Sequence, residues 1–292
     1  VVAVSLKKKT LPVPWRLRDV GAHDISPGRW TPPEADVRRV ARRARSLGLD
    51  VRLLPMLTLD EGGPGLWRGT LAPAYPERFW AAYARFVRSM AQLAEETGAS
   101  LLYVGSELTS LGGPDQAERW RAIAEVARAD FGGLLGYATN HDALDRLAAA
   151  PWVDVVGVSA YFPLSTAAHA GQGALDARWS SIAQRLGDLS DRVGRPLVLT
   201  EVGFPSVEGA LLRPWDGASG RPIDHEAQRL GLAAVRRALA GEPRIREATV
   251  WSAFGPGGPH DAGFSPLGKP AEAELRRWAT RASAPFASPR RR

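Results

Sequence analysis

Two glutamates each follow a short apolar run that is typical of a buried strand. Glu107 comes directly after Leu101–Ser106, and Glu201 comes directly after Leu197–Thr200. If their carboxyl groups lie about 5 Å apart, one can attack an anomeric carbon while the other donates and then removes a proton, which hydrolyses a glycosidic bond with retention of configuration. The alternative is that each glutamate pairs with an arginine. The spacing therefore predicts either a pair of catalytic carboxylates or two structural ion pairs.

Other polar and aromatic residues lie at or just after predicted strand ends, or in loop-like stretches. Aromatic rings stack on the apolar faces of sugars, so the aromatic members of this set are candidate sugar platforms, although each could instead cap the end of the fold. The residues near strand ends are Asn140, His141, Tyr161 and Trp251, and the aromatic residues in loop-like stretches are Trp30, Trp67, Trp215 and Phe254.

The elements that position these residues alternate along the chain. Short β-rich apolar runs are each followed by a stretch with helical periodicity, such as Arg38, Arg42 and Arg45 set against an apolar face. The predicted strands are Val1–Ser5, Val51–Met56, Leu101–Ser106, Leu134–Thr139, Val153–Ala160, Leu197–Thr200 and Ala248–Ser252. The predicted helices are Pro32–Leu47, Pro76–Thr97, Asp115–Ala129, Leu144–Ala149, Leu175–Val193, His225–Ala240 and Lys269–Arg281.

Continuous apolar strands that alternate with amphipathic helices predict an α/β fold with a parallel sheet. A doubly wound nucleotide-binding sheet would have a glycine-rich turn after its first strand, and Lys7–Pro14 contains no glycine. A (β/α)8 TIM barrel instead places functional groups after several different strands, as here. Seven strands are recognised, so we expect a TIM barrel in which the chain begins at the second strand. Residues 1–281 are predicted to form this single domain, with a disordered basic tail at 282–292.

Composition limits the function further. The chain has 292 residues, no cysteine, and 38 Lys and Arg against 31 Asp and Glu, for a net charge of +7. Because the cations alternate with acidic residues along helices, we expect no nucleic-acid partner. No apolar run approaches the ~20 residues of a membrane span. No intact signal peptide is visible in Val1–Thr10, and the compartment and oligomeric state are left open.

Three segments together resemble a known enzyme family. They are Val104-Gly105-Ser106-Glu107-Leu108, Gly157-Val158-Ser159-Ala160-Tyr161-Phe162-Pro163-Leu164 and Thr200-Glu201-Val202-Gly203-Phe204. They are similar to the retaining glycoside hydrolases with catalytic glutamates on strands four and seven, and in particular to the β-mannanase-like enzymes of family 113. Shorter matches are Gly48–Val51, Trp67–Gly69, Pro214–Trp215 and Trp251. The resemblance covers Val1 to about Trp278.

The resemblance implies a role for each matching residue. Glu107 would be the acid/base and Glu201 the nucleophile, with Tyr161 bonded to Glu201 and Trp251 forming the floor beneath the reacting sugar. Ser106, Asn140, His141, Trp67 and Trp215 would contact substrate. The implied substrate is a β-linked, mannan-like carbohydrate, and no cofactor or metal is implied.

Two departures from the family pattern keep other functions open. Ser106 stands where related enzymes place an asparagine that contacts the sugar, and Leu54-Pro55-Met56 replaces a Lys-Pro-His pattern. The chain could therefore be a catalytically inactive barrel that only binds carbohydrate. The dipeptides His23-Asp24, His141-Asp142 and His260-Asp261 suggest a metal-dependent hydrolase as a third hypothesis, although the further ligands that such a site needs are not evident.

Overall fold

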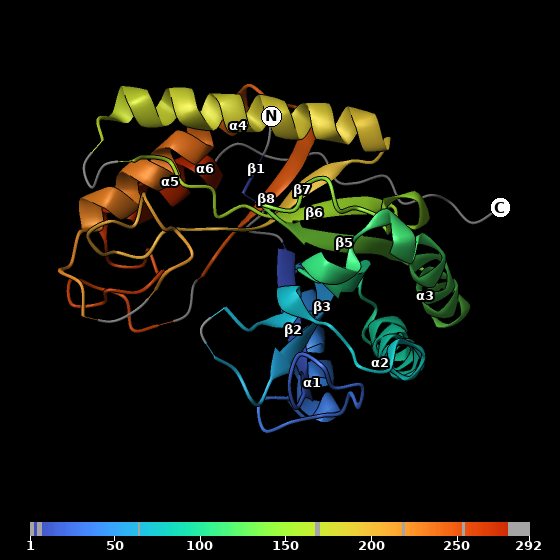
Figure 1. Ribbon diagram of the computed structural model, residues 1–292. Coiled ribbons are helices and arrows are strands. Elements are labelled where there is room, and N and C mark those ends of the chain that lie inside the picture. Colours follow the sequence, from blue (N-terminus) through green and yellow to red (C-terminus); the bar gives the residue numbers. More distant parts are fainter. Residues whose placement is uncertain are drawn as a thin grey trace. The chain divides into compact units, whose positions relative to one another are not determined.

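The structure, a computed structural model, describes residues 3–4, 8–63, 65–166, 170–217, 220–252 and 255–279 (Figure 1). The described chain divides into two compact units. The N-terminal unit comprises residues 8–139 and 143–156, and the C-terminal unit comprises residues 3–4, 140–142 and 157–279 where these are described. The predicted single domain over 1–281 stays a prediction, and the predicted tail at 282–292 lies outside the described residues.

Four strands of the N-terminal unit pair in the order β5-β4-β3-β2, and each printed pairing is parallel. The longest ladder joins β2 to β3 from Lys8 opposite Asp50 to Leu17 opposite Leu59. All six residues of β4 are buried, as expected for a central strand of a parallel sheet. The strands are β2 (Lys8–Leu17), β3 (Asp50–Leu59), β4 (Leu101–Ser106) and β5 (Leu134–Asn140).

The helices of this unit pack beside one another, with α2 in contact with α1 and α3 (Figure 1). Pro76 begins α2 at a position where its missing N–H is not needed, and Gly98 ends it in the left-handed conformation. The helices are α1 (Glu34–Ser46), α2 (Pro76–Thr97) and α3 (Ala117–Asp130), with 3-10 turns η1 (Arg68–Thr70), η2 (Thr109–Leu111), η3 (Pro114–Gln116) and η4 (Ala150–Trp152).

The C-terminal unit has strands in the order β1-β8-β7-β6, and β1 and β7 both run parallel to β8. Strand β6 begins in the N-terminal unit and ends in this one. Asp224 caps α5, because its Oδ1 accepts a hydrogen bond from the N–H of Ala227 at 2.9 Å. The elements are β1 (Ala3–Val4), β6 (Val155–Ser159), α4 (Gln172–Val193), β7 (Leu197–Val202), α5 (His225–Ala240), β8 (Ile245–Val250) and α6 (Pro270–Ala279).

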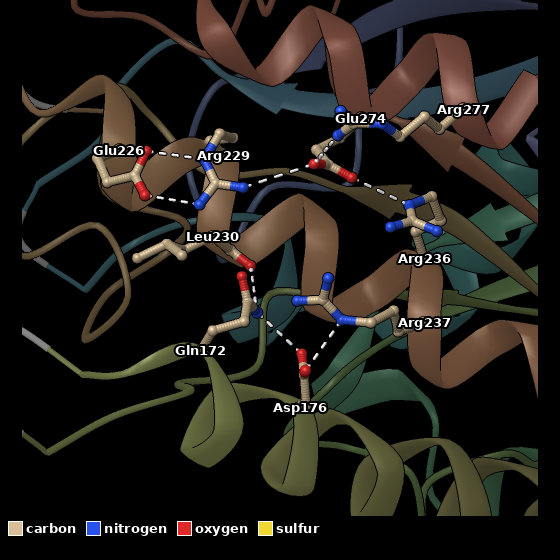
Figure 2. A network of polar contacts seen from close by, with 9 residues as sticks. All are labelled: Gln172, Asp176, Glu226, Arg229, Leu230, Arg236, Arg237, Glu274 and Arg277. Atoms are coloured by element: carbon tan, nitrogen blue, oxygen red, sulfur yellow. Dashed lines mark hydrogen bonds and ion pairs between the residues drawn. The ribbon is translucent and has the colours of Figure 1, made fainter.

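A network of ion pairs joins the helices of this unit (Figure 2). Glu274 on α6 is buried and accepts from three arginines: Arg236 at 3.1 Å, Arg277 at 2.5 Å and Arg229 at 3.5 Å. Asp176 on α4 pairs with an arginine of α5 in the same view. These contacts fix α4 and α6 against α5.

The predicted α/β class with parallel strands is confirmed, and seven of the described strands have five to ten residues. The first of these seven is β2 and not Val1–Ser5, of which only the two-residue strand β1 is described. The predicted helix over Leu144–Ala149 is wrong, because that segment forms turns that lead into η4. No helix in the described part of the chain is long and apolar enough to cross a membrane.

Candidate active site

Glu201 lies near the end of β7 and is buried, with 7% of its surface exposed. The hydroxyl of Tyr161 donates a hydrogen bond to Glu201 Oε2 at 2.8 Å. The backbone is also joined at this point, because the N–H of Ala160 donates to the carbonyl oxygen of Glu201 at 2.7 Å. Two adjacent strand ends therefore hold a carboxylate and a phenol in one orientation.

Trp251 is held beside the same strand end. Its backbone N–H donates to the carbonyl oxygen of Val202, the residue after Glu201, at 2.9 Å. A Cβ on Gly203 would lie 2.0 Å from the carbonyl oxygen of Trp251, so this close approach requires glycine. The peptide bond between Trp251 and Ser252 is cis. Trp251 is partly exposed, and its backbone lies beside the strand end that carries Glu201.

His141 and Trp215 form a second aromatic cluster in the C-terminal unit. Their rings stack with centroids 5.6 Å apart and planes at 24°, and the ring of Phe162 meets His141 edge-on at 5.3 Å. His141 Nδ1 lies 3.2 Å from Asn140 Oδ1, so these two predicted site residues contact each other. Trp215 remains 49% exposed, which leaves a large apolar surface available for a ligand.

Glu107 directly follows β4 in the N-terminal unit and is 6% exposed. Its φ angle is 57°, the left-handed region that side-chain-bearing residues rarely adopt. Its backbone N–H donates to the carbonyl oxygen of Ala138 at 2.8 Å, which fixes the turn. Ser106, the last residue of β4, is also buried.

Arg68 pairs with Glu107, and Nη2 of the arginine lies 2.5 Å from Oε2 of the glutamate. The Arg68 guanidinium lies 5.7 Å from the ring of Trp67. A Cβ on Gly69 would come within 2.2 Å of that same ring, so the Trp67 conformation depends on glycine at position 69. The hydroxyl of Thr70 accepts from the N–H of Trp67 and donates to its carbonyl oxygen, which closes the turn.

The structure brings most of the predicted site residues together within one unit or the other. Glu201, Tyr161 and Trp251 cluster in the C-terminal unit, as do Asn140, His141 and Trp215, whereas Ser106, Glu107 and Trp67 belong to the N-terminal unit. Of the other candidate platforms, Trp30 is 69% exposed beneath the Arg29 guanidinium, and Phe254 lies outside the described residues.

Three neighbours of these residues were not predicted as site residues. Phe264 meets Tyr161 edge-on at 6.3 Å, Phe162 packs on His141, and Arg68 pairs with Glu107. Of the three, Arg68 had a signal in the sequence, since it lies inside the Trp67–Gly69 match. Phe162 directly follows Tyr161, whereas nothing in the sequence relates Phe264 to the strand ends.

The metal-site hypothesis started from the histidine–aspartate dipeptides, and the first of these makes a contact between its own two side chains. His23 Nε2 lies 3.7 Å from Asp24 Oδ1. Within the described ranges, no group of three or more His, Asp and Glu side chains is arranged to hold a metal ion.

Comparison with known proteins extends this description. Residues 26–253 match the model of Glycoside Hydrolase Family 113. A sequence comparison with curated proteins gave no match. A GH113 β-mannanase structure from Alicyclobacillus acidocaldarius is similar, with a TM-score of 0.82, 24% identity, and coverage of 94% of this chain and 87% of that chain.

Two further structures are also similar to this chain. A GH113 β-1,4-mannanase gives a TM-score of 0.83 at 19% identity over 94% of this chain and 88% of that one. A β-D-glucuronidase from Dictyoglomus thermophilum gives 0.62 at 14% identity over 90% of this chain and 46% of that one. At these identities the likeness shows the fold, and the predicted α/β barrel is confirmed as the fold class.

Proposed function

The chain belongs to glycoside hydrolase family 113, and from that premise we propose that it is a retaining β-glycosidase acting on β-linked, mannan-like carbohydrate. Its proposed nucleophile is Glu201 and its proposed acid/base is Glu107. The family match and the β-mannanase names of similar structures support the substrate class. The position of both glutamates at the ends of parallel strands supports the roles, because barrel enzymes carry their catalytic groups there.

The proposed reaction has two steps. In the first, Glu201 attacks the anomeric carbon while Glu107 gives its proton to the glycosidic oxygen, so that the leaving sugar departs as an alcohol and a covalent glycosyl-enzyme forms. In the second, Glu107, now a carboxylate, takes a proton from water as the water oxygen attacks the anomeric carbon and releases Glu201. Two inversions leave the configuration unchanged.

The hydrogen bond from Tyr161 to Glu201 is the observation that carries the proposal. A nucleophile must be ionised and correctly oriented, and a phenol that donates to one carboxylate oxygen favours the ionised form and orients the group. The proposed roles of the remaining residues follow from their places. Trp251 would support the reacting sugar from below, Trp215, His141 and Trp67 would stack on neighbouring sugars, and Asn140 and Ser106 would bond to hydroxyl groups.

The first experiment measures hydrolysis of manno-oligosaccharides by Glu201→Ala, with Glu208→Ala as a matched control. Glu208 is an exposed glutamate in the loop that follows β7. We expect Glu201→Ala to lose activity by at least about 10⁴-fold with an unchanged circular dichroism spectrum, whereas Glu208→Ala keeps wild-type activity. Undiminished hydrolysis by Glu201→Ala contradicts the proposal.

The second experiment separates the two roles. On an aryl β-mannoside with a good leaving group, azide should restore turnover to Glu107→Ala and give the β-mannosyl azide, because a small anion can attack the glycosyl-enzyme without a general base. The control is Glu118→Ala on the exposed surface of α3. Proton NMR of the wild-type reaction should show the β-anomer as the first product, and the α-anomer would exclude a double displacement.

A binding protein without catalysis is the second candidate function. The ion pair between Arg68 and Glu107 favours it, because an acid/base residue must carry a proton in the first step. Calorimetric titration with manno- and gluco-oligosaccharides, combined with a reducing-end assay, separates the two: binding without turnover supports the binding protein. Loss of activity on chelation would instead support the metal-dependent hydrolase.

A further inference from the structure

A buried ammonium group joins two loops of the C-terminal unit. Lys269, the residue before α6, has 0% of its side chain exposed, and its Nζ donates to Ser206 Oγ at 2.9 Å and to the carbonyl oxygen of Gly263 at 3.1 Å. Asp261 Oδ1 lies 3.6 Å from the same nitrogen. Ser206 belongs to the loop after β7, the strand that carries Glu201, whereas Asp261 and Gly263 belong to the loop after β8. Since β7 and β8 pair, the ammonium connects the segments that leave two neighbouring strands.

Further hydrogen bonds hold the backbone of the second loop at Gly263 and Phe264. The N–H of Gly263 donates to Asp261 Oδ1 at 2.6 Å, and its carbonyl oxygen also accepts from the N–H of Ser206 at 3.1 Å. Gln228, a fully buried residue of α5, donates from Nε2 to the carbonyl oxygen of Phe264 at 3.0 Å. The backbone that carries the Phe264 ring is therefore fixed by groups from three other segments.

The ring of Phe264 lies beside the residues that surround the proposed nucleophile. It meets the ring of Tyr161 edge-on, with centroids 6.3 Å apart and planes at 76°, an arrangement that aromatic pairs favour. A Cβ on Gly217 would lie 2.8 Å from this ring and a Cβ on Gly203 would lie 3.3 Å from it, so the ring packs closely against both glycines. Tyr161 in turn donates to Glu201. A displaced Phe264 would remove a packing contact from the phenol that orients the carboxylate.

We propose that Lys269 is a positioning residue for the proposed nucleophile, because by joining the two loops it keeps the Phe264 ring against Tyr161, whose hydroxyl orients Glu201. This inference rests on the proposed function, since it names a residue that orients the nucleophile of that function. Lys269 acts on Glu201 through the loop, Phe264 and Tyr161.

Burying a cation costs free energy, so stability alone does not explain Lys269. Burial lowers the pKa of Lys269 below its ordinary value, and the carboxylate of Asp261 opposes this shift. Lys269 also directly precedes α6, where the partial positive charge of a helix N-terminus disfavours a cation. Apolar residues of similar volume often stabilise a protein as well as a buried ion pair does. A buried ion pair instead requires particular partners at particular distances, so Lys269 favours one arrangement of the two loops.

The direct test follows Phe264 without relying on turnover. Protein labelled with 4-fluorophenylalanine is studied by ¹⁹F NMR, and the Phe264 signal is assigned by its disappearance in Phe264→Leu. Lys269→Met keeps a side chain of similar length but removes the charge and the donors. We expect the Phe264 signal of this variant to shift by more than its linewidth and to broaden or split, because the ring then samples more than one position.

The matched control is Glu274→Ala, which removes a buried ion-pair partner from α6 and should leave the Phe264 signal in place. This control separates a specific effect on the loop from a general loss of stability. An unchanged Phe264 signal in folded Lys269→Met overturns the inference. If Lys269→Met does not fold, Lys269→Gln, which is also neutral, is measured in the same way.

Activity supplies a second readout through a double-mutant cycle. We expect kcat/KM for manno-oligosaccharides to fall by about tenfold in Lys269→Met. Tyr161→Phe lacks the hydroxyl that Lys269 positions, so adding Lys269→Met to Tyr161→Phe should change kcat/KM by less than about twofold. A purely structural role would give the same loss in both backgrounds. That result overturns the inference, as does an undiminished kcat/KM in Lys269→Met.

The role of Lys269 and the proposed function fail on different results. Wild-type hydrolysis by Glu201→Ala overturns the assignment of the nucleophile. If Glu201→Ala is inactive, an unmoved Phe264 signal or equal losses in the two backgrounds overturn the role of Lys269 alone.

Discussion

At the scale of single residues, the two glutamates differ in the chemistry of their partners. Glu201 accepts a hydrogen bond from the neutral hydroxyl of Tyr161, whereas Glu107 accepts one from the cation of Arg68. The phenol orients one oxygen of the proposed nucleophile. The guanidinium orients one oxygen of the proposed acid/base residue and adds a positive charge beside it. Each proposed catalytic carboxylate is therefore held in position by a side chain from another part of its own unit.

Removing the Tyr161 hydroxyl should reduce activity without unfolding the protein. In Tyr161→Phe, Glu201 loses a hydrogen bond of the kind that is worth about 1.5 to 3 kcal/mol when one partner is charged. We expect kcat/KM for manno-oligosaccharides to fall by roughly 10- to 150-fold, with a circular dichroism spectrum that still shows a folded protein at the assay temperature. Tyr75→Phe, at a residue that is 56% exposed, is the control and should stay within about twofold of wild type. Wild-type kinetics in Tyr161→Phe would show that this bond does not serve the reaction.

The sequence predicted the residues at strand ends and the bond between Tyr161 and Glu201, but it did not identify which arginine pairs with Glu107. Glu107, Tyr161 and Glu201 could be placed because the end of an apolar run marks the edge of a parallel sheet. The partner of Glu107 could not, since Arg68 is 39 positions away in the chain and reaches the glutamate only through the path of its turn. Ion pairs between loops depend on tertiary structure, which periodicity does not describe.

At the scale of elements, Glu274 is the residue through which α6 is held to α5. Its side chain is 3% exposed and pairs with Arg229, Arg236 and Arg277. Glu274→Ala should lower the free energy of unfolding by about 3 kcal/mol, because it removes a buried carboxylate that three guanidinium groups share. Urea denaturation followed by tryptophan fluorescence measures the change.

Glu125→Ala is the control for this prediction. Glu125 pairs with Arg121 on the surface of α3 and is 65% exposed, so its loss should cost less than about 0.5 kcal/mol. Equal stabilities of the Glu274 and Glu125 variants would show that the network of Figure 2 contributes no more than a surface ion pair.

The ion pair between Glu242 and Arg244 should make the free energy of unfolding depend on pH. The hydrogen bonds from Arg244 hold the pKa of Glu242 below its ordinary value of 4.5. Because the folded-state pKa is the lower one, the stabilisation is fully present above the unfolded value and is lost as pH falls through the folded value. Wild type should exceed Glu242→Gln by about 1 kcal/mol at pH 7, and the difference should shrink below pH 4.5. Urea unfolding at pH 7 and near pH 3.5 tests this, and a constant difference would refute it.

Capping signals explain which elements were predicted well. Helix α5 has the predicted bounds because Asp224 caps its start and Gly241 follows its end.

Strand β2 was not predicted because Pro12 and Pro14 argue against a strand. Both are tolerated because, within its unit, β2 has a single neighbour, β3, so one edge of the strand needs no hydrogen-bond donors. The false helix at Leu144–Ala149 has apolar residues but lacks the length for a stable helix.

At the scale of the whole molecule, a net charge of +7 coexists with extensive pairing of its arginines. Arg38 pairs with Glu34 and Glu96, and Arg119 pairs with Glu77. We expect no saturable binding of a 30-base-pair DNA duplex below about 10 μM protein in 150 mM salt, because paired cations release few counterions from phosphate. Fluorescence anisotropy measures this, and micromolar binding with a steep salt dependence would reverse the interpretation of the charge.

The fold class was predictable because alternating strands and helices leave few architectures open. The choice of a barrel over a doubly wound sheet depended on residues at several strand ends and on the absence of glycine from Lys7–Pro14. The division into two compact units was not predictable, since no change of composition marks residues 140–142 or 157.

The left-handed backbone at Glu107 has a thermodynamic consequence for the whole protein. A φ of 57° costs a residue with a Cβ about 1 kcal/mol or more, and glycine would adopt it freely. Glu107→Gly should therefore relax the backbone while it destroys the proposed acid/base function. If the Glu107 carboxylate had no function, its replacement by glycine would only stabilise the folded protein. A glutamate in this strained conformation therefore argues against a protein that has lost its catalytic activity.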